Sequence, residues 1–199
     1  LTEDEAKKSY NKMFFSYLKT FERLGLKAIP MAADTGPIGG DLSHEFIILA
    51  ETGESQIYAD KRIFQIDLSK YESTDSSLSQ MRKDFSNFYS ATDEKFDEKK
   101  FNELVEKNNQ IKTKGIEVGH IFYFGDKYSK PMNCLIDDKS GKKVSVKMGS
   151  YGIGVSRLVG AIIEAKYDEK NEVMKWPISV APYDICLLYT SDAADEGLG

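Results

Sequence analysis

Apolar residues recur at helical spacing close to the start of the chain. Thr2 and Glu5 have the spacing of a capping box, in which each side chain bonds the backbone N–H of the other. The apolar positions that follow recur at the spacing of one helix face: Ala6, Tyr10, Met13, Phe14, Tyr17, Leu18, Phe21 and Leu24. Gly25 then stands where a left-handed cap residue is expected. This pattern predicts a helix over about 3–24 whose apolar face packs on a sheet.

Short apolar stretches after this helix predict strands. Residues 26–31, 44–50 and 56–59 are three such stretches, and the turn sequence 51–54 predicts a hairpin between the last two. Residues 33–40 contain three glycines and a proline, which predicts a tightly shaped loop.

Residues 61–110 have a different character, because they are polar and rich in Ser, Asp and Lys, with scattered aromatic residues. This composition predicts a solvated insertion with one or two short helices, one of them over 101–107.

Regular patterns return at Gly115. Residues 116–124 predict a further strand, and 133–136 with 143–146 predict a hairpin. Gly152 opens a second apolar helix. Antiparallel strands with helices packed behind them predict an α+β fold.

Composition narrows the possible functions. Hydrophobic residues make up 41% and aromatic residues 12%, enough to build a core. The net charge of −5 argues against a stand-alone nucleic-acid binder, which usually has a basic surface. No apolar run is long enough to cross a membrane, and no signal-peptide pattern opens the chain. Cys134 and Cys186 have no metal-ligand spacing, so we expect a reducing cytoplasm, with Cys134 as a small buried residue.

Two segments carry the most specific sequence patterns. The first is Ala33-Asp-Thr-Gly-Pro-Ile-Gly-Gly-Asp-Leu-Ser-His-Glu-Phe46. The second begins Gly115-Ile-Glu-Val-Gly-His-Ile-Phe122 and ends Met148-Gly-Ser-Tyr-Gly-Ile-Gly-Val-Ser-Arg157. In the order and identity of their residues, both segments resemble the bacterial-type prolyl-tRNA synthetases, a family of class II aminoacyl-tRNA synthetases. The resemblance extends from Leu1 to about Ile185, and it implies an antiparallel class II sheet with flanking helices.

The resemblance makes Gly152, Gly154 and Arg157 part of the third class II signature motif. It implies that the two glycines let the backbone approach ATP and that Arg157 binds the γ-phosphate. A guanidinium suits this task because its planar fork donates several bonds and stays charged. The alternative for Arg157 is a surface salt bridge.

Glu117 and His120 lie on the strand that precedes this motif. Strand alternation places Glu117 and Gly119 on one face and Val118 and His120 on the other, unless a bulge intervenes. The resemblance implies that Glu117 lies on the ATP side and helps to hold Mg²⁺; the alternative is a solvated strand carboxylate. The resemblance also implies that His120 forms part of the wall of the aminoacyl pocket. The alternative is a core histidine that is hydrogen-bonded within the protein.

The remaining candidates belong to the proline pocket of the family. Glu45 would bind the amine of the substrate or position an arginine, and its alternative is a surface salt bridge. His44 is expected to be structural and to bond the glycine-rich loop. The resemblance also places Gly149 and Ser150 in the proline pocket.

The resemblance also divides the chain. It implies that 1–181 is the C-terminal part of a class II catalytic core, with 61–114 as a short insertion in place of an editing domain. Residues 182–199 would begin an anticodon-binding domain, to about 185, and continue as a non-native tail, because 186–196 resembles a translated sequencing adapter. Leu1 corresponds to a position just after the second class II motif, so we expect this chain alone to be inactive.

The implied activity is ligation of proline to tRNA(Pro) with ATP and Mg²⁺, in a cytoplasmic homodimer. Two alternatives remain at this point. One is a non-catalytic class II-like accessory protein, and the other is a paralogue that adenylates an amino acid for a carrier other than tRNA.

Overall fold

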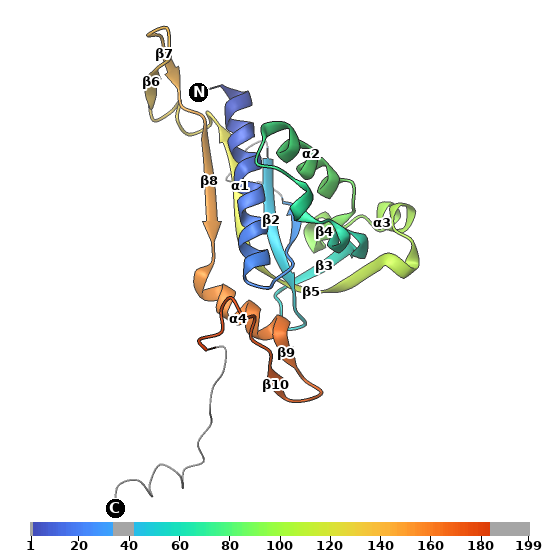
Figure 1. The fold of residues 1–199 in the computed structure, drawn as a ribbon. Coiled ribbons are helices and arrows are strands. Elements are labelled where there is room, and N and C mark those ends of the chain that lie inside the picture. Colours follow the sequence, from blue (N-terminus) through green and yellow to red (C-terminus); the bar gives the residue numbers. More distant parts are fainter. Residues whose placement is uncertain (1, 34–41, 184–199) are drawn as a thin grey trace, which may run out of the picture.

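A single long helix lies across a curled antiparallel sheet (Figure 1). The computed structural model describes residues 2–33 and 42–183. The predicted glycine-rich loop beyond residue 33, the adapter-like tail and Cys186 lie outside the described residues. We find no helix in the described ranges that is both long and apolar enough to cross a membrane.

Helix α1 (Glu3–Arg23) confirms the first sequence prediction. Thr2 and Glu5 form the capping box, and Gly25 adopts a φ of 73° after the last turn. The predicted apolar face is buried against the sheet, with Tyr10, Phe14 and Phe21 at most 1% exposed. The rings of Phe14 and Phe21 pack against Phe46 of the sheet, and the ring of Tyr10 packs against His44.

The central sheet is built around one strand of 16 residues, β5 (Gln110–Gly125). The strand order is β1 (Ile29–Ala32), β2 (Leu42–Leu49), β5, β3 (Ser55–Asp60) and β4 (Ser90–Thr92), and β8 (Met148–Ile153) also pairs with β5. Different segments of β5 pair with different strands: 110–115 pairs with β3, 115–123 with β2 and 119–125 with β8. All of these pairings are antiparallel, which confirms the α+β class.

The predicted hairpin between β2 and β3 is wrong, because β5 lies between them. The turn at 51–54 crosses the backbone of β5 instead of closing a hairpin. A Cβ added to Gly53 would lie 2.2 Å from the carbonyl oxygen of Gly115, so only glycine permits this crossing. The same turn residues can form a hairpin or a connection that crosses another strand. Which of the two forms here depends on β5, which is distant in the sequence.

Residues 61–109 are more than a solvated insertion. They form short 3₁₀ turns at Lys61–Gln65, Leu68–Lys70, Asp93–Lys95 and Lys107–Asn109, together with α2 (Asp75–Ser86) and α3 (Glu98–Leu104). Leu78, Met81 and Phe85 of α2 join the main core. The helix predicted over 101–107 starts and ends three residues earlier, because Asp97 caps it and Val105 is already extended.

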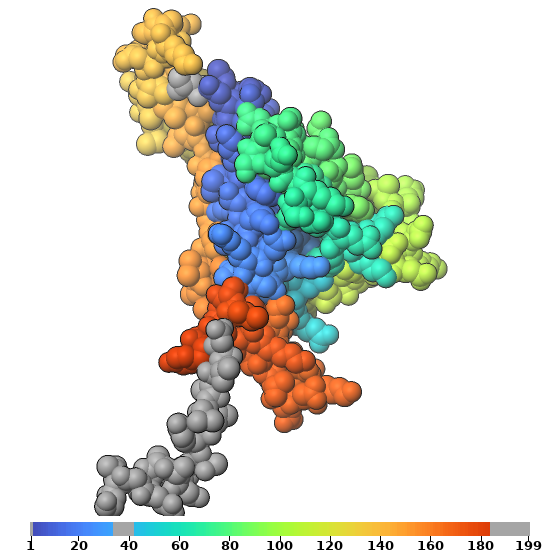
Figure 2. Space-filling view, in the orientation of Figure 1, coloured from blue at the N-terminus to red at the C-terminus, as the bar shows by residue number. Residues whose placement is uncertain are grey.

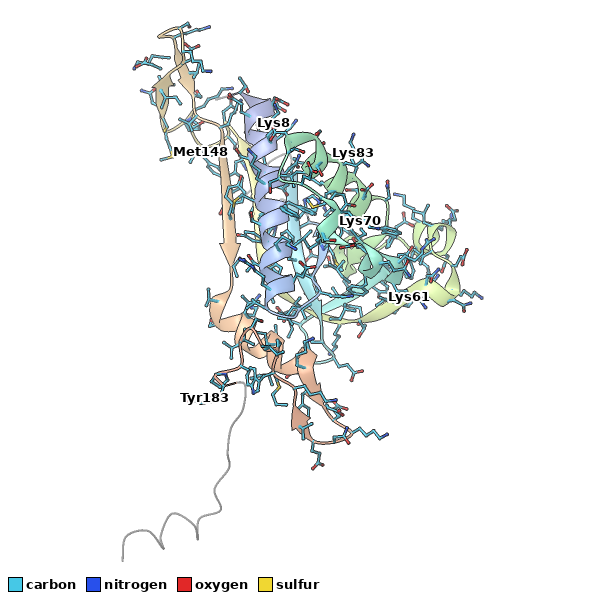
Figure 3. All side chains as sticks on the ribbon, viewed as in Figure 1. Lys8, Lys61, Lys70, Lys83, Met148 and Tyr183 are labelled. Carbon is cyan, nitrogen blue, oxygen red and sulfur yellow. The ribbon has the colours of Figure 1, made fainter. Side chains whose placement is uncertain are left out.

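The C-terminal third carries two small projections and a second helix. The predicted hairpin is present as β6 (Leu135–Asp137) and β7 (Lys143–Ser145), and α4 (Val155–Lys166) begins after Gly154. β9 (Tyr167–Asp168) and β10 (Val173–Met174) form a second short pair. The two pairs project from opposite ends of the body (Figure 2). In Figure 3, Met148 marks the start of β8 beside the first pair, and Tyr183 marks the end of the described chain.

Cys134 corrects another expectation. It lies just before β6 and is exposed, because this hairpin stands away from the core.

Candidate functional site

A bulge in β5 brings together side chains that strict alternation would separate. Phe46 pairs with Gly119 and Ile47 with Glu117, so Val118 is the extra residue on β5. Val118 is 1% exposed and points into the core. An extra residue in one strand shifts the alternation of its side chains by one position. Glu117 and His120 therefore lie on the same face, which is the arrangement expected if a bulge interrupts the strand alternation.

Glu45, Glu117 and His120 form a compact cluster on this face. The imidazole Nδ1 lies 3.2 Å from Oε1 of Glu117 and 3.9 Å from Oε1 of Glu45. Ligand atoms of the three residues lie within 4.8 Å of one another, close enough to surround one metal ion. Burial raises the pKa of the Glu45 carboxyl, and the negative charge of Glu117 raises it further. A cation at this position would relieve both effects.

The imidazole of His120 is held on its other sides as well. Its Nε2 lies 2.6 Å from the hydroxyl oxygen of buried Ser43 on β2. Its ring stacks on Phe122 at a centroid distance of 3.9 Å and an angle of 18°. The side chain is consequently fixed in one orientation, with Nδ1 toward the two carboxylates.

Arg157 joins the cluster from the first turn of α4. Its Nη1 donates to the backbone carbonyl of Glu117 at 2.9 Å and lies 3.5 Å from a carboxylate oxygen of Glu54. Half of the Arg157 side chain is exposed, which leaves its other N–H groups accessible. Gly154 holds the helix start against the same bulge, since its N–H donates to the carbonyl of Val118 at 3.0 Å.

Strand β8 borders the cluster on one side. Gly152 pairs with His120 and Ser150 pairs with Phe122, so Ser150 lies on the cluster face. A side chain at Gly152 would meet nothing within 4 Å, so the face is open there. Gly149 pairs with Tyr123, and a Cβ on it would meet the hydroxyl of Tyr151 at 2.7 Å. The structure thus groups Glu45, Glu117, His120, Ser150, Gly152 and Arg157, and it directs Gly149 to the opposite face.

Comparison with known proteins places these residues in a family. The chain matches the tRNA synthetase class II core domain (G, H, P, S and T) over residues 1–166. It belongs to this family. Among its relatives, the proline–tRNA ligase of Pelagibacter ubique is 62% identical over 188 residues, and that of Hyphomonas neptunium is 54% identical over 189. Each alignment covers 94% of this chain and 42% of the relative. The proline–tRNA ligase of Nitrobacter winogradskyi is 48% identical over 197 residues, or 98% of this chain and 44% of that protein. The chain therefore spans about two fifths of the length of the curated relatives it matches.

A hollow of 380 Å³ lies beside the cluster in this class II core segment. It is lined by Glu45, Glu54, Ser55, Gln56, Thr92, Asp93, Glu94 and Glu117. Five of these residues are carboxylates, and none of the lining residues is cationic. The negative charge of this lining favours a cation over an anion in the hollow.

Sequence reasoning did not find Ser43 or Glu54. Ser43 lies two positions before Glu45 on the same strand, so strand alternation alone could have placed both on one face. Glu54 had no comparable signal, because its position beside Arg157 depends on the crossing of Gly53 over Gly115.

His44 lies on the other side of the sheet. Its Nδ1 is 2.7 Å from the hydroxyl of Tyr10 on α1, and the side chain is buried. Burial lowers its pKa to about 4. This agrees with a structural role, although the partner described here is α1.

Proposed function

We propose that this chain is part of a proline–tRNA ligase and carries the γ-phosphate, divalent-cation and part of the proline contacts of its active site. The observation that carries the proposal is the bond from Arg157 to the carbonyl of Glu117. This bond supports the proposal because it holds the half-exposed guanidinium of Arg157 next to the strand that carries Glu117.

Arg157 would bind the γ-phosphate of ATP. Two anchors hold its guanidinium, the Glu117 carbonyl and the Glu54 carboxylate, and the half-exposed side chain can offer its remaining N–H groups to phosphate oxygens. The open space at Gly152 and the glycine at position 154 leave room for a nucleotide next to the backbone.

Glu117, together with Glu45, would hold Mg²⁺. The donor set fits this ion, because carboxylate oxygens are the ligands that Mg²⁺ prefers. When bound, the ion would offset the negative charge of the carboxylates and of the phosphates of ATP. Glu45 could alternatively pair with the ammonium of proline, and its position against His120 suits either role.

His120 and Ser150 would form part of the proline pocket, together with Gly149, which lies next to Ser150 on β8. In the proposed reaction the carboxylate of proline attacks the α-phosphorus of ATP and pyrophosphate leaves. The prolyl group is then transferred to the 3′ end of tRNA(Pro). The residues described here would contribute by positioning and by charge stabilisation.

The proposal concerns the longer protein that contains this segment, acting in the cytoplasm as a homodimer. Its test is proline-dependent ATP–pyrophosphate exchange by that protein, compared with exchange driven by the other amino acids. We expect exchange with proline well above that with any other amino acid. Exchange that is absent, or that responds equally to unrelated amino acids, would refute the assignment; light scattering on the same sample would test the dimer.

A further inference from the structure

The hydrogen-bonding capacity of His120 is used completely within the protein. One ring nitrogen faces Ser43 at 2.6 Å, and the other faces Glu117 at 3.2 Å and Glu45 at 3.9 Å. Phe122 covers one face of the ring. The imidazole side chain is only 20% exposed, so water has limited access to it.

The partners of the two nitrogens differ in what they can offer. An ionised carboxylate only accepts hydrogen bonds, whereas a serine hydroxyl can both donate and accept. A neutral imidazole has one N–H and one lone pair. A lone pair on Nδ1 would face two carboxylate oxygens and would be repelled by both. A proton on Nδ1 removes this repulsion and leaves the lone pair of Nε2 to accept from Ser43.

We propose that the carboxylates of Glu117 and Glu45 keep the proton of the neutral His120 ring on Nδ1, and that Ser43 is a positioning residue whose hydroxyl donates to Nε2 and holds the ring toward them. Ser43 does not touch the substrate in this arrangement. It acts through His120, which in turn holds the two carboxylates side by side despite their like charges.

This arrangement decides which metal ions the cluster accepts. With Nδ1 protonated and Nε2 bonded to Ser43, His120 offers no lone pair, although its geometry would allow it to be a third ligand. The cluster is then an oxygen-only site of two carboxylates. Such a site suits hard cations such as Mg²⁺, whereas a histidine ligand would favour Zn²⁺. The inference rests on the proposed function, because it specifies how the proposed Mg²⁺ site discriminates against metal ions that prefer nitrogen ligands.

The experiment is a long-range ¹H–¹⁵N NMR spectrum of this chain with ¹⁵N-labelled histidine, recorded at alkaline pH, where neutral imidazole predominates. The chain has only two histidines, so the spectrum is simple. Tyr10→Phe disturbs only the partner of His44, and it therefore assigns the two rings and serves as the matched control. We expect His120 to show a protonated Nδ1 and an unprotonated Nε2.

Glu117→Gln and Ser43→Ala complete the test. We expect Glu117→Gln, which replaces an acceptor-only carboxylate by an amide that can also donate, to give averaged signals of both tautomers at His120 and to leave His44 unchanged. We expect Ser43→Ala to keep the proton on Nδ1 but to shift the Nε2 resonance, because the donor to that nitrogen is lost. Adding Mg²⁺ to the wild-type chain should leave both His120 nitrogens in the same protonation state.

A wild-type His120 with its proton on Nε2 would overturn the inference, as would an unchanged tautomer in Glu117→Gln or an Nε2 resonance that does not move in Ser43→Ala. If Ser43→Ala does not fold, the wild-type spectrum decides alone. None of these measurements uses ATP or proline, so a negative result here leaves the exchange assay of the longer protein as a separate test of its function.

Discussion

Arg157 Nη1 donates to the backbone carbonyl of Glu117, 2.9 Å away, while the next carbonyl along β5, that of Val118, accepts from the N–H of Gly154. Two consecutive carbonyls at the bulge thus bind the beginning of α4. The bulge that turns Glu117 toward His120 is also the point at which the helix and its arginine are attached. The relative position of Arg157 and the carboxylates is therefore fixed by backbone groups, which substitutions elsewhere cannot easily change.

Arg157→Ala in the longer protein tests the proposed phosphate contact. We expect the loss of one or more charge-assisted bonds to ATP, each contributing roughly 1.5–3 kcal/mol. Such a loss would lower ATP-dependent exchange by about one to two decades. Arg157→Lys should restore only part of the activity, because an ammonium cannot reproduce the fork.

The measurement is pyrophosphate exchange against ATP concentration, together with thermal unfolding. Stability should change little, because half of the side chain is exposed. Arg23→Ala, which removes an exposed arginine at the end of α1, is the control and should leave exchange unaltered. Normal exchange in Arg157→Ala would mean that this residue is a surface salt-bridge partner of Glu54.

Gly53→Ala tests the crossing of the β2–β3 connection over β5. The added Cβ would meet the carbonyl oxygen of Gly115 at 2.2 Å, so the backbone must move and we expect destabilisation of about 1–3 kcal/mol or more. Gly160→Ala is the matched control within α4, where a Cβ meets nothing within 4 Å. There we expect a gain of roughly 0.5–1 kcal/mol, because alanine has the higher helix propensity. Urea unfolding of both variants measures these opposite changes in stability. A Gly53→Ala variant as stable as the unaltered chain would contradict the crossing.

His44 predicts how stability depends on pH. Its pKa is about 4 in the folded chain, because burial disfavours the charged ring, and about 6.5 in an unfolded chain. Between these values the unfolded state binds more protons, so stability falls as the pH falls from about 6.5 to 4. The full difference corresponds to about 3 kcal/mol.

Urea midpoints at a series of pH values measure this slope. His44→Gln should be less stable at neutral pH, because it loses the packing of the ring, but it should have a shallower slope in this window. An equally steep slope in His44→Gln would assign the acid sensitivity to other groups.

Residues 61–114 lead to a prediction about proofreading. Leu78, Met81 and Phe85 are part of the main core, so this segment completes the synthetase body and does not form a separate domain. We expect the longer protein to lack hydrolysis of alanyl-tRNA in cis. Preformed alanyl-tRNA incubated with the purified protein should be lost only at the buffer rate, and rapid deacylation without a helper protein would contradict this.

Local sequence signals were sufficient where local interactions determine the structure. The capping box of Thr2 and Glu5, the spacing of Tyr10, Phe14 and Phe21, and the left-handed Gly25 all act within a few residues, and α1 follows them closely. Glu117, His120 and Arg157 could be named as candidates because they lie in segments that resemble the family whose model the chain matches.

The features that could not be predicted depend on distant partners. Residues 51–54 form a turn whose role is decided by Gly115, more than 60 positions later. The bulge at Val118 depends on the register between β2 and β5, and no residue type in 115–122 requires it. Cys134 is exposed because its hairpin stands away from the body, and the pattern of residues around it contains no sign of that.

The central place of β5 has a consequence for how the chain is made. Strands β2 and β3 leave the ribosome before β5, yet both of them hydrogen-bond to β5, which begins about 50 residues after β3 ends. During that interval their edges have no β5 to pair with, and α1 has only part of its sheet to cover. Nascent chains that end before β5 should therefore be recognised by chaperones and proteases as unfinished, and the addition of residues 110–125 supplies the partner of both strands.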